Sequence, residues 1–337
     1  MARSPLLDLT FGYMPAQLLY AAAELRLADA LADRTRPTGD LAAETGTRPE
    51  ALRRLLRALT CLGVTTQEGP DEFALTEAGR RLRGDATDSV QGLVELFCGP
   101  EVWRSWGDLV ETLRTGEPAW ERVTGTTSFQ YFESHPEEAV TFNKAMSEHT
   151  REVAPAIIGG YDFTRFGAIA DLGGGDGTLL AALLRAVPSA RGVLFDLEAG
   201  LNEADVTLKA AGVADRCERV AGDFFESVPA GLDAYVLKSV IHDWDDDRSA
   251  AVLRSVRKAA GADAKVLLLE TVMPERVTPE NGGVTLNDMN MLVCTGGRER
   301  TETEFRDLLD AAGFELTAVA GPLLPSNYSV VEGTPKT

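Results

Sequence analysis

The sequence predicts an α/β protein in which a Rossmann-like, mostly parallel sheet follows a mainly helical N-terminal region. From residue 161 onward, short apolar segments alternate with helical ones, which is typical of parallel strands with helices on both faces. The first of these segments, residues 168–172, leads through Asp171 into glycines at positions 173, 175 and 177 and then into a helical stretch. A strand, a glycine turn and a helix in this order indicate a site for a nucleotide-like ligand.

Residues 1–90 are predicted to form a winged-helix-like domain. Residues 15–32 predict one apolar helix, Thr38 is a possible cap for a second, and a third runs from Arg48 to Leu62, where Gly63 ends it. Segments 64–68 and 72–76 predict a two-stranded wing. Because the first helix is apolar, we expect it to form a subunit interface, and hence a homodimer through the N-terminal helices.

A winged helix also raises the alternative of a DNA-binding regulator. The third helix carries Arg53, Arg54 and Arg57, but the first hundred residues hold more acidic than basic side chains. The whole chain of 337 residues has a formal net charge of −19. A chain this acidic repels a phosphate backbone, so we expect no nucleic-acid partner.

Residues 91–160 predict a helical linker rich in aromatic side chains, with Gly159 and Gly160 at its end. Phe142, Met146 and His149 recur at the spacing of one helix face. Two interpretations stay open for them: a core stripe with one hydrogen-bonded histidine, or the wall of a substrate pocket to which the linker contributes.

Cysteine usage and hydropathy limit the class of protein further. Cys61, Cys98, Cys217 and Cys294 are scattered and form no C-x-x-C pair, and the three histidines lie far apart. We therefore expect buried, reduced thiols and no metal site. No apolar segment approaches the length of a membrane span, and the start of the chain lacks a secretory signal pattern. These observations predict a cytoplasmic protein with no membrane partner.

The third domain is expected over residues 161–337. Strands are predicted at 168–172, 193–196, 217–220, 233–238 and 265–270, and an antiparallel edge hairpin at 314–320 and 328–331. Helices are predicted near 178–187, 203–211, 247–259 and 302–312. In such a sheet the ligand lies off the carboxyl ends of the strands. Candidate residues at these ends are Asp171, Asp196, Gly222, Asp223, Phe224, Lys238, Ser239 and Glu270.

Two of these ends have a more specific interpretation. Asp196 closes the second strand, where a ribose-binding acid is found in folds of this kind. Asp223 and Phe224 combine an acceptor for an exocyclic amine with an aromatic face, which suits an adenine, although a structural role stays open for both.

His242, just after the fourth strand, is the candidate general base. An ordinary imidazole pKa near 6.5 allows it to take a proton from a hydroxyl, and such help contributes roughly 10²–10⁴-fold to a rate. Glu270 and Glu299 are candidates for holding its ring. A structural histidine is the alternative. Trp244 either covers an adenine or packs, and the acids 245–247 are expected to cap the next helix.

Four blocks together resemble the S-adenosylmethionine-dependent O-methyltransferases of small-molecule metabolism. They are residues 171–177, 222–225, 238–244, and 296–301 followed by Glu304 and Phe305. This family includes plant caffeate and flavonoid enzymes and bacterial polyketide and antibiotic tailoring enzymes. The resemblance covers nearly the whole chain and implies a winged-helix dimerisation module, an aromatic linker and a Rossmann-like methyltransferase domain.

The resemblance also implies the cofactor and the roles of individual residues. S-adenosylmethionine is the implied methyl donor and S-adenosylhomocysteine the product, with His242 as base and Glu270 and Glu299 steering it. The expected cofactor-binding residues are Asp171, Gly173, Gly175, Asp196, Leu197, Gly222, Asp223, Phe224, Lys238, Ser239 and Trp244. The acceptor pocket is implied to be lined by Phe142, Met146, His149, Asp288 and Met291. No metal is needed, because the sulfonium charge already makes the methyl group electrophilic.

The predicted function is O-methylation of a phenolic or enolic hydroxyl on an aromatic or polyketide-type metabolite. Cys294 and Thr295 stand where the plant enzymes have an asparagine, so the acceptor's identity does not carry over. Some antibiotic-pathway relatives lack the histidine that this chain retains. The alternative is therefore a cofactor-binding member with changed chemistry: a hydroxylase, decarboxylase or cyclase. An NAD dehydrogenase is disfavoured by the spacing of the glycines.

Overall fold

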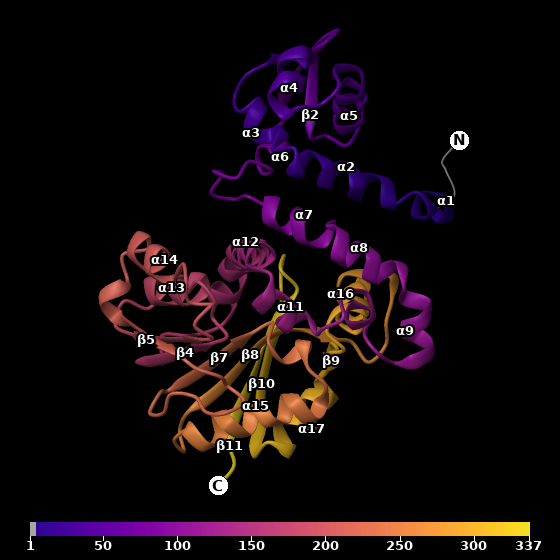
Figure 1. Cartoon of the computed structure of the whole chain (residues 1–337). Coiled ribbons are helices and arrows are strands. Elements are labelled where there is room, and N and C mark those ends of the chain that lie inside the picture. Colours follow the sequence, from indigo (N-terminus) through magenta and orange to yellow (C-terminus); the bar gives the residue numbers. More distant parts are fainter. Residues whose placement is uncertain (1–4) are drawn as a thin grey trace. The chain divides into compact units, whose positions relative to one another are not determined.

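The computed structural model describes residues 5–337, which form two compact units (Figure 1). The first unit contains the described residues up to Arg104 and the segment Glu137–His149. The second contains Ser105–Pro136 and Thr150–Thr337. The long helix α12 (Pro136–Gly160) contributes to both units.

The first unit is built from short helices and a small antiparallel sheet with the strand order β1-β3-β2. Its elements are α1 (Pro5–Thr10), α2 (Tyr13–Glu24), α3 (Leu27–Leu31), β1 (Arg36–Pro37), α4 (Thr38–Thr45), α5 (Pro49–Cys61), β2 (Thr65–Gly69), β3 (Glu72–Leu75), α6 (Glu77–Arg80), α7 (Gln91–Phe97) and the start of α8 (Pro100–Gly107). The helices followed by the β2–β3 ribbon have the predicted winged-helix arrangement.

The third of the predicted helices, α5, shows why the sequence folds in this way. Pro49 occupies its first turn, where a missing N–H costs nothing. Leu52, Leu56 and Leu59 lie on one face and are buried in the core of the unit. Gly63 follows with a φ of 77°, a conformation that ends helices and favours glycine.

Two predictions for the first unit were wrong in detail. Residues 15–32 are not one helix: α2 ends at Glu24, Arg26 adopts a φ of 50°, and α3 begins at Leu27. The turn redirects the chain so that Leu27 and Leu31 enter the core. Thr38 is not a helix cap, because its hydroxyl and its N–H both donate to the carbonyl oxygen of Asp71 and so tie α4 to the hairpin.

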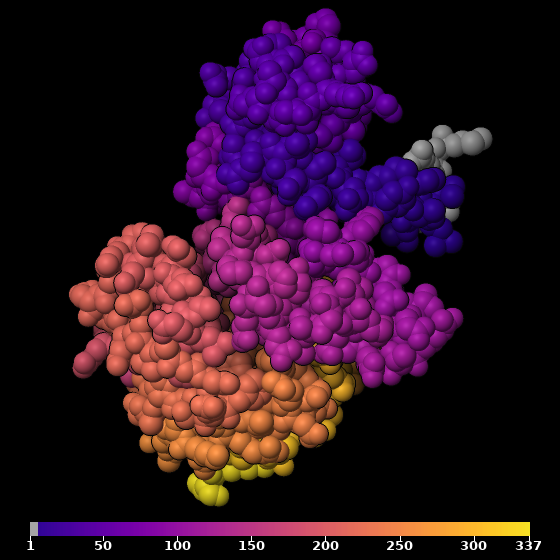
Figure 2. Space-filling view, viewed as in Figure 1, coloured from indigo at the N-terminus to yellow at the C-terminus, as the bar shows by residue number. Residues whose placement is uncertain are grey.

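The N-terminal segment of the first unit carries exposed apolar side chains. This segment is indigo in Figure 2, where it lies at the surface. The exposed side chains on α1 and at the start of α2 are Leu6, Leu7, Leu9, Phe11, Tyr13 and Met14.

The second unit consists of a sheet with helices on both faces, as predicted. Its remaining helices are α9 (Leu109–Thr115), α10 (Ala119–Thr124), α11 (Ser128–Ser134), α13 (Thr178–Ala186), α14 (Ala204–Ala210), α15 (Asp246–Ala259), α16 (Gly282–Cys294) and α17 (Glu302–Ala311), with short 3₁₀ turns at Ala214–Arg216, Ile241–Asp243 and Pro279–Asn281. Its strands are β4 (Ala168–Leu172), β5 (Arg191–Asp196), β6 (Cys217–Ala221), β7 (Ala234–Lys238), β8 (Lys265–Met273), β9 (Arg300–Thr301), β10 (Phe314–Leu323) and β11 (Tyr328–Pro335).

The strand order places the ends of β4 and β7 at the centre of the sheet. The order is β10-β11-β8-β7-β4-β5-β6, and β9 pairs with the far end of β8. The strands from β8 through β7, β4 and β5 to β6 are parallel, whereas β11 and β10 are antiparallel. The chain goes outward from β4 to β6 and then returns to β7, so β4 and β7 flank the point where the direction reverses. Ligands of open α/β sheets bind at the carboxyl ends beside this point.

Alternating side chains give the sheet two hydrophobic layers. On β4, Ile169 packs with α13 and α14, whereas Ala170 and Leu172 pack with α15 and α17. The same alternation continues along β7 and β8. Figure 1 shows α13 and α14 on one side of the sheet and α15 and α17 on the other. Burial on both faces explains why these strands are almost wholly apolar.

Among residues 5–337, no helix is both long enough and apolar enough to cross a lipid bilayer. The four cysteines are free thiols, but only Cys294 is buried and Cys61 is exposed, so the expectation that all four are buried was wrong.

Candidate active site

The turn after β4 is shaped by glycines and held by an acid from the next strand. Gly173, Gly175 and Gly177 have φ values of 70°, 56° and 78°, which side chains with a Cβ disfavour. The N–H of Gly173 donates to the carbonyl oxygen of Phe195 at 2.8 Å. The N–H of Gly175 donates to Oδ2 of Asp196, also at 2.8 Å. The two predicted strand ends therefore meet at one place.

Asp171 and Asp196 place two buried carboxyl groups beside this turn. Burial, together with the charge of Asp196, raises the pKa of Asp171 to about 7. Burial also raises the pKa of Asp196, against the effect of its N–H donors at Gly175 and Leu197. Asp171 is only 1% exposed, and its Oδ2 accepts no hydrogen bond from the described residues. A donor on a bound ligand would satisfy this orphaned acceptor.

The end of β6 approaches the same turn. The N–H of Gly222 donates to the carbonyl oxygen of Asp196 at 2.9 Å. Asp223 accepts the N–H of Phe225 at 2.8 Å, so its carboxylate shapes its own loop. A Cβ on Gly173 would lie 3.7 Å from the ring of Phe224. The Phe224 ring therefore borders the glycine turn.

Lys238 and Ser239 end β7, the strand beside β4. Burial lowers the pKa of Lys238 to about 8, against the charges of Glu270 and Asp171. Ser239 has a φ of 53°, a strained conformation for a residue with a side chain. Its hydroxyl lies 2.6 Å from the hydroxyl of Tyr328. After this turn, the N–H groups of Val240 and Ile241 both donate to Oε1 of Glu270, at 3.1 and 2.9 Å.

His242 lies in the 3₁₀ turn after β7, with two carboxylates beside one of its ring nitrogens. Its Nδ1 is 2.9 Å from Oε1 of Glu299 and 3.5 Å from Oε2 of Glu270. The side chains of Glu270 and Glu299 are fully buried, and that of His242 is 13% exposed. Because Nδ1 faces these acids, Nε2 faces away from them, and it lies 4.0 Å from Oδ1 of Asp243.

Glu270 and Glu299 change the pKa of the His242 ring. Burial alone would lower the pKa of His242, but the charges of Glu270 and Glu299 and the hydrogen bond to Glu299 raise it to about 10. Burial raises the pKa of Glu270. For Glu299, burial acts in the same direction, but the hydrogen bond and the charge of His242 bring its pKa below the ordinary value. These shifts favour a proton on Nδ1 of His242 facing an ionised Glu299.

The segment that carries Glu299 is packed directly against the His242 loop. A Cβ on Gly297 would collide with the carbonyl oxygen of His242, so only glycine fits there. The N–H of Arg298 donates to that same oxygen at 2.8 Å. The two adjacent glycines at positions 296 and 297 are the signal in the sequence for this close approach.

Arg300 is a structural residue of this site that we did not predict. It is 1% exposed. Its guanidinium donates to the carbonyl oxygens of Ile241 and Trp244 at 3.0 and 2.9 Å and to Oδ1 of Asp246 at 2.8 Å. Arg300, the residue after Glu299, therefore holds the chain on both sides of His242.

Helix α16 holds Glu299 from another direction. Asp288 accepts the backbone N–H of Glu299 at 2.9 Å. The side-chain amide of Asn287, which we did not predict to belong to the site, donates to Oε1 of Glu299. Met291 is buried on the same helix, and Thr295 donates to its carbonyl oxygen. Asp288 and Met291, expected in the acceptor pocket, therefore lie on the helix that supports the carboxylate.

Trp244 lies among aromatic rings. It stacks on Phe129 with 5.1 Å between ring centroids and meets Phe225 edge-on at 5.0 Å. The guanidinium of Arg248 lies 4.3 Å from the centroid of the Trp244 ring, within the range of a cation–π contact. Its Nε1 is buried and donates to none of the described residues. Asp245 caps α15 by accepting the N–H of Arg248, as predicted.

The remaining three predicted pocket residues belong to the first unit. Phe142, Met146 and His149 lie on the part of α12 within that unit, and each is half-buried. The other predicted site residues lie in the second unit.

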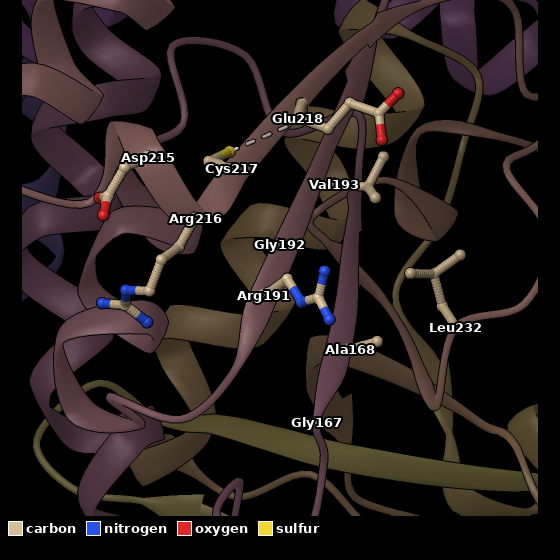
Figure 3. Close-up of a pocket in the computed structure, with 10 residues that line it drawn as sticks. All are labelled: Gly167, Ala168, Arg191, Gly192, Val193, Asp215, Arg216, Cys217, Glu218 and Leu232. Atoms are coloured by element: carbon tan, nitrogen blue, oxygen red, sulfur yellow. Dashed lines mark hydrogen bonds between the residues drawn. The ribbon is translucent and has the colours of Figure 1, made fainter.

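A shallow cavity of about 470 Å³ lies elsewhere on the second unit (Figure 3). Its lining includes Ala168, Arg191 and Cys217, which begin β4, β5 and β6. It therefore lies at the amino edge of the sheet, opposite to Asp171 and Asp196. None of the predicted site residues lines it.

His242, Glu270 and Glu299 also have the composition of a metal site, since their ligand atoms all lie within 4.8 Å of one another. However, Oε1 of Glu270 already accepts two N–H groups, and Oε1 of Glu299 accepts His242 and Asn287. An oriented imidazole with its acids accounts for these contacts.

A glycine turn edged by acids, with an oriented imidazole at the same edge of the sheet, defines a Rossmann-like enzyme that uses a nucleotide-type cofactor. Family models describe the chain further. An O-methyltransferase domain matches residues 106–315, and an O-methyltransferase dimerisation domain matches residues 7–84.

Individual relatives agree with the models. The chain is 42% identical to a phenazine O-methyltransferase of Lysobacter antibioticus, over 98% of this chain and 96% of the relative. It is 42% identical to an O-demethylpuromycin O-methyltransferase of Streptomyces alboniger, over 99% and 89%. The crystal structure of LaPhzM matches with a TM-score of 0.94 at 42% identity, over 98% of both chains.

A further structure was solved with its ligands. It is an O-methyltransferase of neocarzinostatin biosynthesis in complex with S-adenosylmethionine and 2-hydroxy-5-methyl naphthoic acid. It matches with a TM-score of 0.79 at 34% identity, over 95% of this chain and 96% of that one. The chain therefore belongs to the family of S-adenosylmethionine-dependent O-methyltransferases, as the four sequence blocks predicted.

Proposed function

We propose that this protein methylates a phenolic or enolic hydroxyl of an aromatic small molecule, with His242 as the general base. The observation that carries the proposal is the contact of Nδ1 of His242 with Glu299 at 2.9 Å, with Glu270 next to it. A proton fixed on Nδ1 leaves the lone pair of Nε2 for the proton of an acceptor hydroxyl. Neighbouring strand ends at the same edge provide the cofactor contacts.

The residues at the carboxyl edge fit S-adenosylmethionine. Asp171 offers an unsatisfied buried acceptor, and Asp196 offers a carboxylate at the position of a ribose-binding acid. Gly173 and Gly175 allow close approach of the ligand to the backbone. Leu197, Gly222, Asp223, Phe224, Lys238, Ser239 and Trp244 complete the proposed cofactor-binding set. When bound, the cofactor supplies a methyl group activated by its sulfonium charge.

His242 must lose a proton before it can act as a base. With a pKa of about 10 in the protein alone, its ring is an imidazolium at neutral pH. A cation bound at the same edge opposes that charge and lowers the pKa of the ring. The neutral ring then accepts the hydroxyl proton at Nε2, and Glu299 stabilises the imidazolium that forms. Alignment of the attacking oxygen supplies several kcal/mol of the remaining barrier.

The acceptor is proposed to be a planar, hydroxylated aromatic compound. By their names, one relative is a phenazine O-methyltransferase and another a naphthoate O-methyltransferase, and this chain matches both over almost its entire length. Phe142, Met146, His149, Asp288 and Met291 are proposed to line the acceptor site. Apolar and aromatic side chains are the usual lining of such pockets.

The biological unit is proposed to be a homodimer formed by residues 1–90, with residues 91–160 as the linker and 161–337 as the catalytic domain. Exposed Leu6, Leu9 and Phe11 on the N-terminal segment support this, as does the match to a dimerisation domain. Light scattering on the purified chain tests it. The mass of two chains is expected, and the mass of one chain at micromolar concentration contradicts the proposal.

Mass spectrometry of candidate acceptors tests the reaction. Hydroxylated phenazines, naphthoates and simple phenols are incubated with S-adenosylmethionine, and we expect a product heavier by one CH₂ on a hydroxyl oxygen. Loss of carbon dioxide or gain of oxygen without that increment would favour a decarboxylase or hydroxylase on the same scaffold. Methylation of an amine alone would contradict O-methylation. Activity is expected to persist with a chelator present, because no step requires a metal.

A further inference from the structure

We propose that Asn287 is a positioning residue, which keeps Glu299 ionised and turned towards His242. This proposal rests on the base role of His242. Asn287 lies on α16 and is half-buried. Its amide donates to Oε1 of Glu299, the same oxygen that accepts Nδ1 of His242. Two donors from different elements thus converge on one carboxylate oxygen.

The chemistry of the partners fixes the orientation of the amide. An ionised carboxylate only accepts hydrogen bonds, so the NH₂ group of Asn287, and not its oxygen, faces Glu299. The neighbouring Asp288 accepts the backbone N–H of Glu299 at 2.9 Å. Two consecutive residues of α16 therefore hold the side chain and the backbone of Glu299 in place.

Glu299 needs this support because it is buried. It is 3% exposed, and besides His242 the side chains of Thr271 and Asn287 hold its pKa below the ordinary value. The carboxylate of Glu270 lies near the same imidazole nitrogen, 3.5 Å from it. A buried carboxylate beside another acid favours protonation unless donors stabilise its charge. Asn287 supplies such a donor without adding a competing charge.

The ionisation of Glu299 decides which nitrogen of His242 can act. An ionised Glu299 keeps the proton on Nδ1, which leaves Nε2 as the base. A protonated Glu299 would instead donate to Nδ1 and move the ring proton to Nε2, where the ring cannot take a proton from a hydroxyl. Loss of Asn287 is therefore expected to reduce the fraction of enzyme with the active tautomer.

Replacement of Asn287 by leucine removes the amide donor and keeps a side chain of similar size. For N287L we expect kcat to fall roughly 10- to 100-fold, the range typical of residues that orient a histidine through its partner. The KM of the acceptor and the Kd of S-adenosylmethionine are expected to stay within about twofold of the wild-type values. L286A, on an exposed position of the same helix, is the matched control and should leave kcat unchanged. N287A, which also removes the donor and adds no charge, is the variant to use if N287L does not fold.

The decisive measurement is a double-mutant cycle with E299Q. If Asn287 acts through the charge of Glu299, N287L should cause no further loss of kcat in the E299Q background. Additive losses would overturn the proposal, as would an effect of N287L confined to the acceptor KM, which would indicate direct contact with the acceptor. Full turnover by H242Q would instead contradict the role of His242 as the base, on which this proposal rests. Additivity together with an inactive H242Q would contradict only the role of Asn287.

Discussion

Nδ1 of His242 lies 2.9 Å from Oε1 of Glu299, a residue 57 positions further along the chain. The contact joins the turn after β7 to the segment just before β9. It orients the ring, and together with Glu270 it raises the proton affinity of the ring. Both consequences lead to measurable predictions.

Cofactor affinity should depend on the charge state and shape of Asp196. Its two oxygens accept the N–H groups of Gly175 and Leu197. D196N replaces one acceptor with a donor, so both the glycine turn and the proposed ribose contact are weakened. We expect the Kd of S-adenosylmethionine to rise roughly 10- to 100-fold in calorimetry. D205N, at a half-buried position of α14 where the carboxylate pairs with Arg219, is the control, and equal affinities of the two variants would contradict this role.

The affinity for S-adenosylmethionine should rise with pH relative to that for S-adenosylhomocysteine. His242 carries a proton below a pKa of about 10, and only the donor has a sulfonium charge that repels it. Binding of the donor between pH 7 and 9 should therefore release a proton, whereas binding of the product should release less. Calorimetry in buffers of different ionisation enthalpy counts the protons. Equal release for both ligands would show that the sulfonium and the imidazole do not interact.

The titration of His242 also predicts how folding stability changes with pH. An unfolded histidine has a pKa near 6.5, and the folded value of about 10 is higher. The folded state therefore binds the proton more tightly, so this contribution is complete below pH 6.5 and is lost as the pH rises towards 10.

Urea unfolding of wild type and H242Q at several pH values measures this contribution. We expect the free energy of unfolding of the wild type to fall more steeply between pH 7 and 10 than that of H242Q. Parallel curves for the two proteins would mean that the ring titrates normally in the folded state.

Arg300 should matter for the stability of the site loop. R300M leaves the carbonyl oxygens of Ile241 and Trp244 without this donor and removes the partner of Asp246. We expect a loss of about 2–4 kcal/mol in the free energy of unfolding. R306M removes an exposed arginine that pairs with Glu302, and it should cost less than about 1 kcal/mol. A similar cost for both variants would contradict the role of Arg300.

The parts of the site that the sequence could predict are those determined by strand ends. Asp196 and Lys238 are the last residues of β5 and β7, and Asp171 is the last but one of β4. Parallel strands bring such ends to one edge, so a linear pattern is enough to group them. Glu270 was predicted to end its strand, but β8 continues to Met273; Glu270 lies at the same edge because the parallel pairing of β8 with β7 ends at Leu269.

Other features of the structure depend on contacts between distant segments, and no local pattern in the sequence indicates such contacts. Arg300 and Asn287 act on atoms from distant segments, and two partners of Arg300 are backbone carbonyl oxygens. The break at Arg26 was missed because the hydropathy of residues 15–32 fits one helix, and only the core decides that the chain must turn. Asp288 was assigned to the acceptor from family resemblance alone, whereas its contact with the N–H of Glu299 required coordinates.

The most direct test of the account is the turnover of H242Q with a confirmed acceptor, measured together with its affinity for S-adenosylmethionine. We predict that kcat falls by about a hundredfold or more, while the cofactor binds at least as tightly as in the wild type, because the cofactor-binding strand ends are intact and no imidazolium charge opposes the sulfonium. Turnover close to that of the wild type, with the cofactor still bound, would contradict the assignment of His242 as the base.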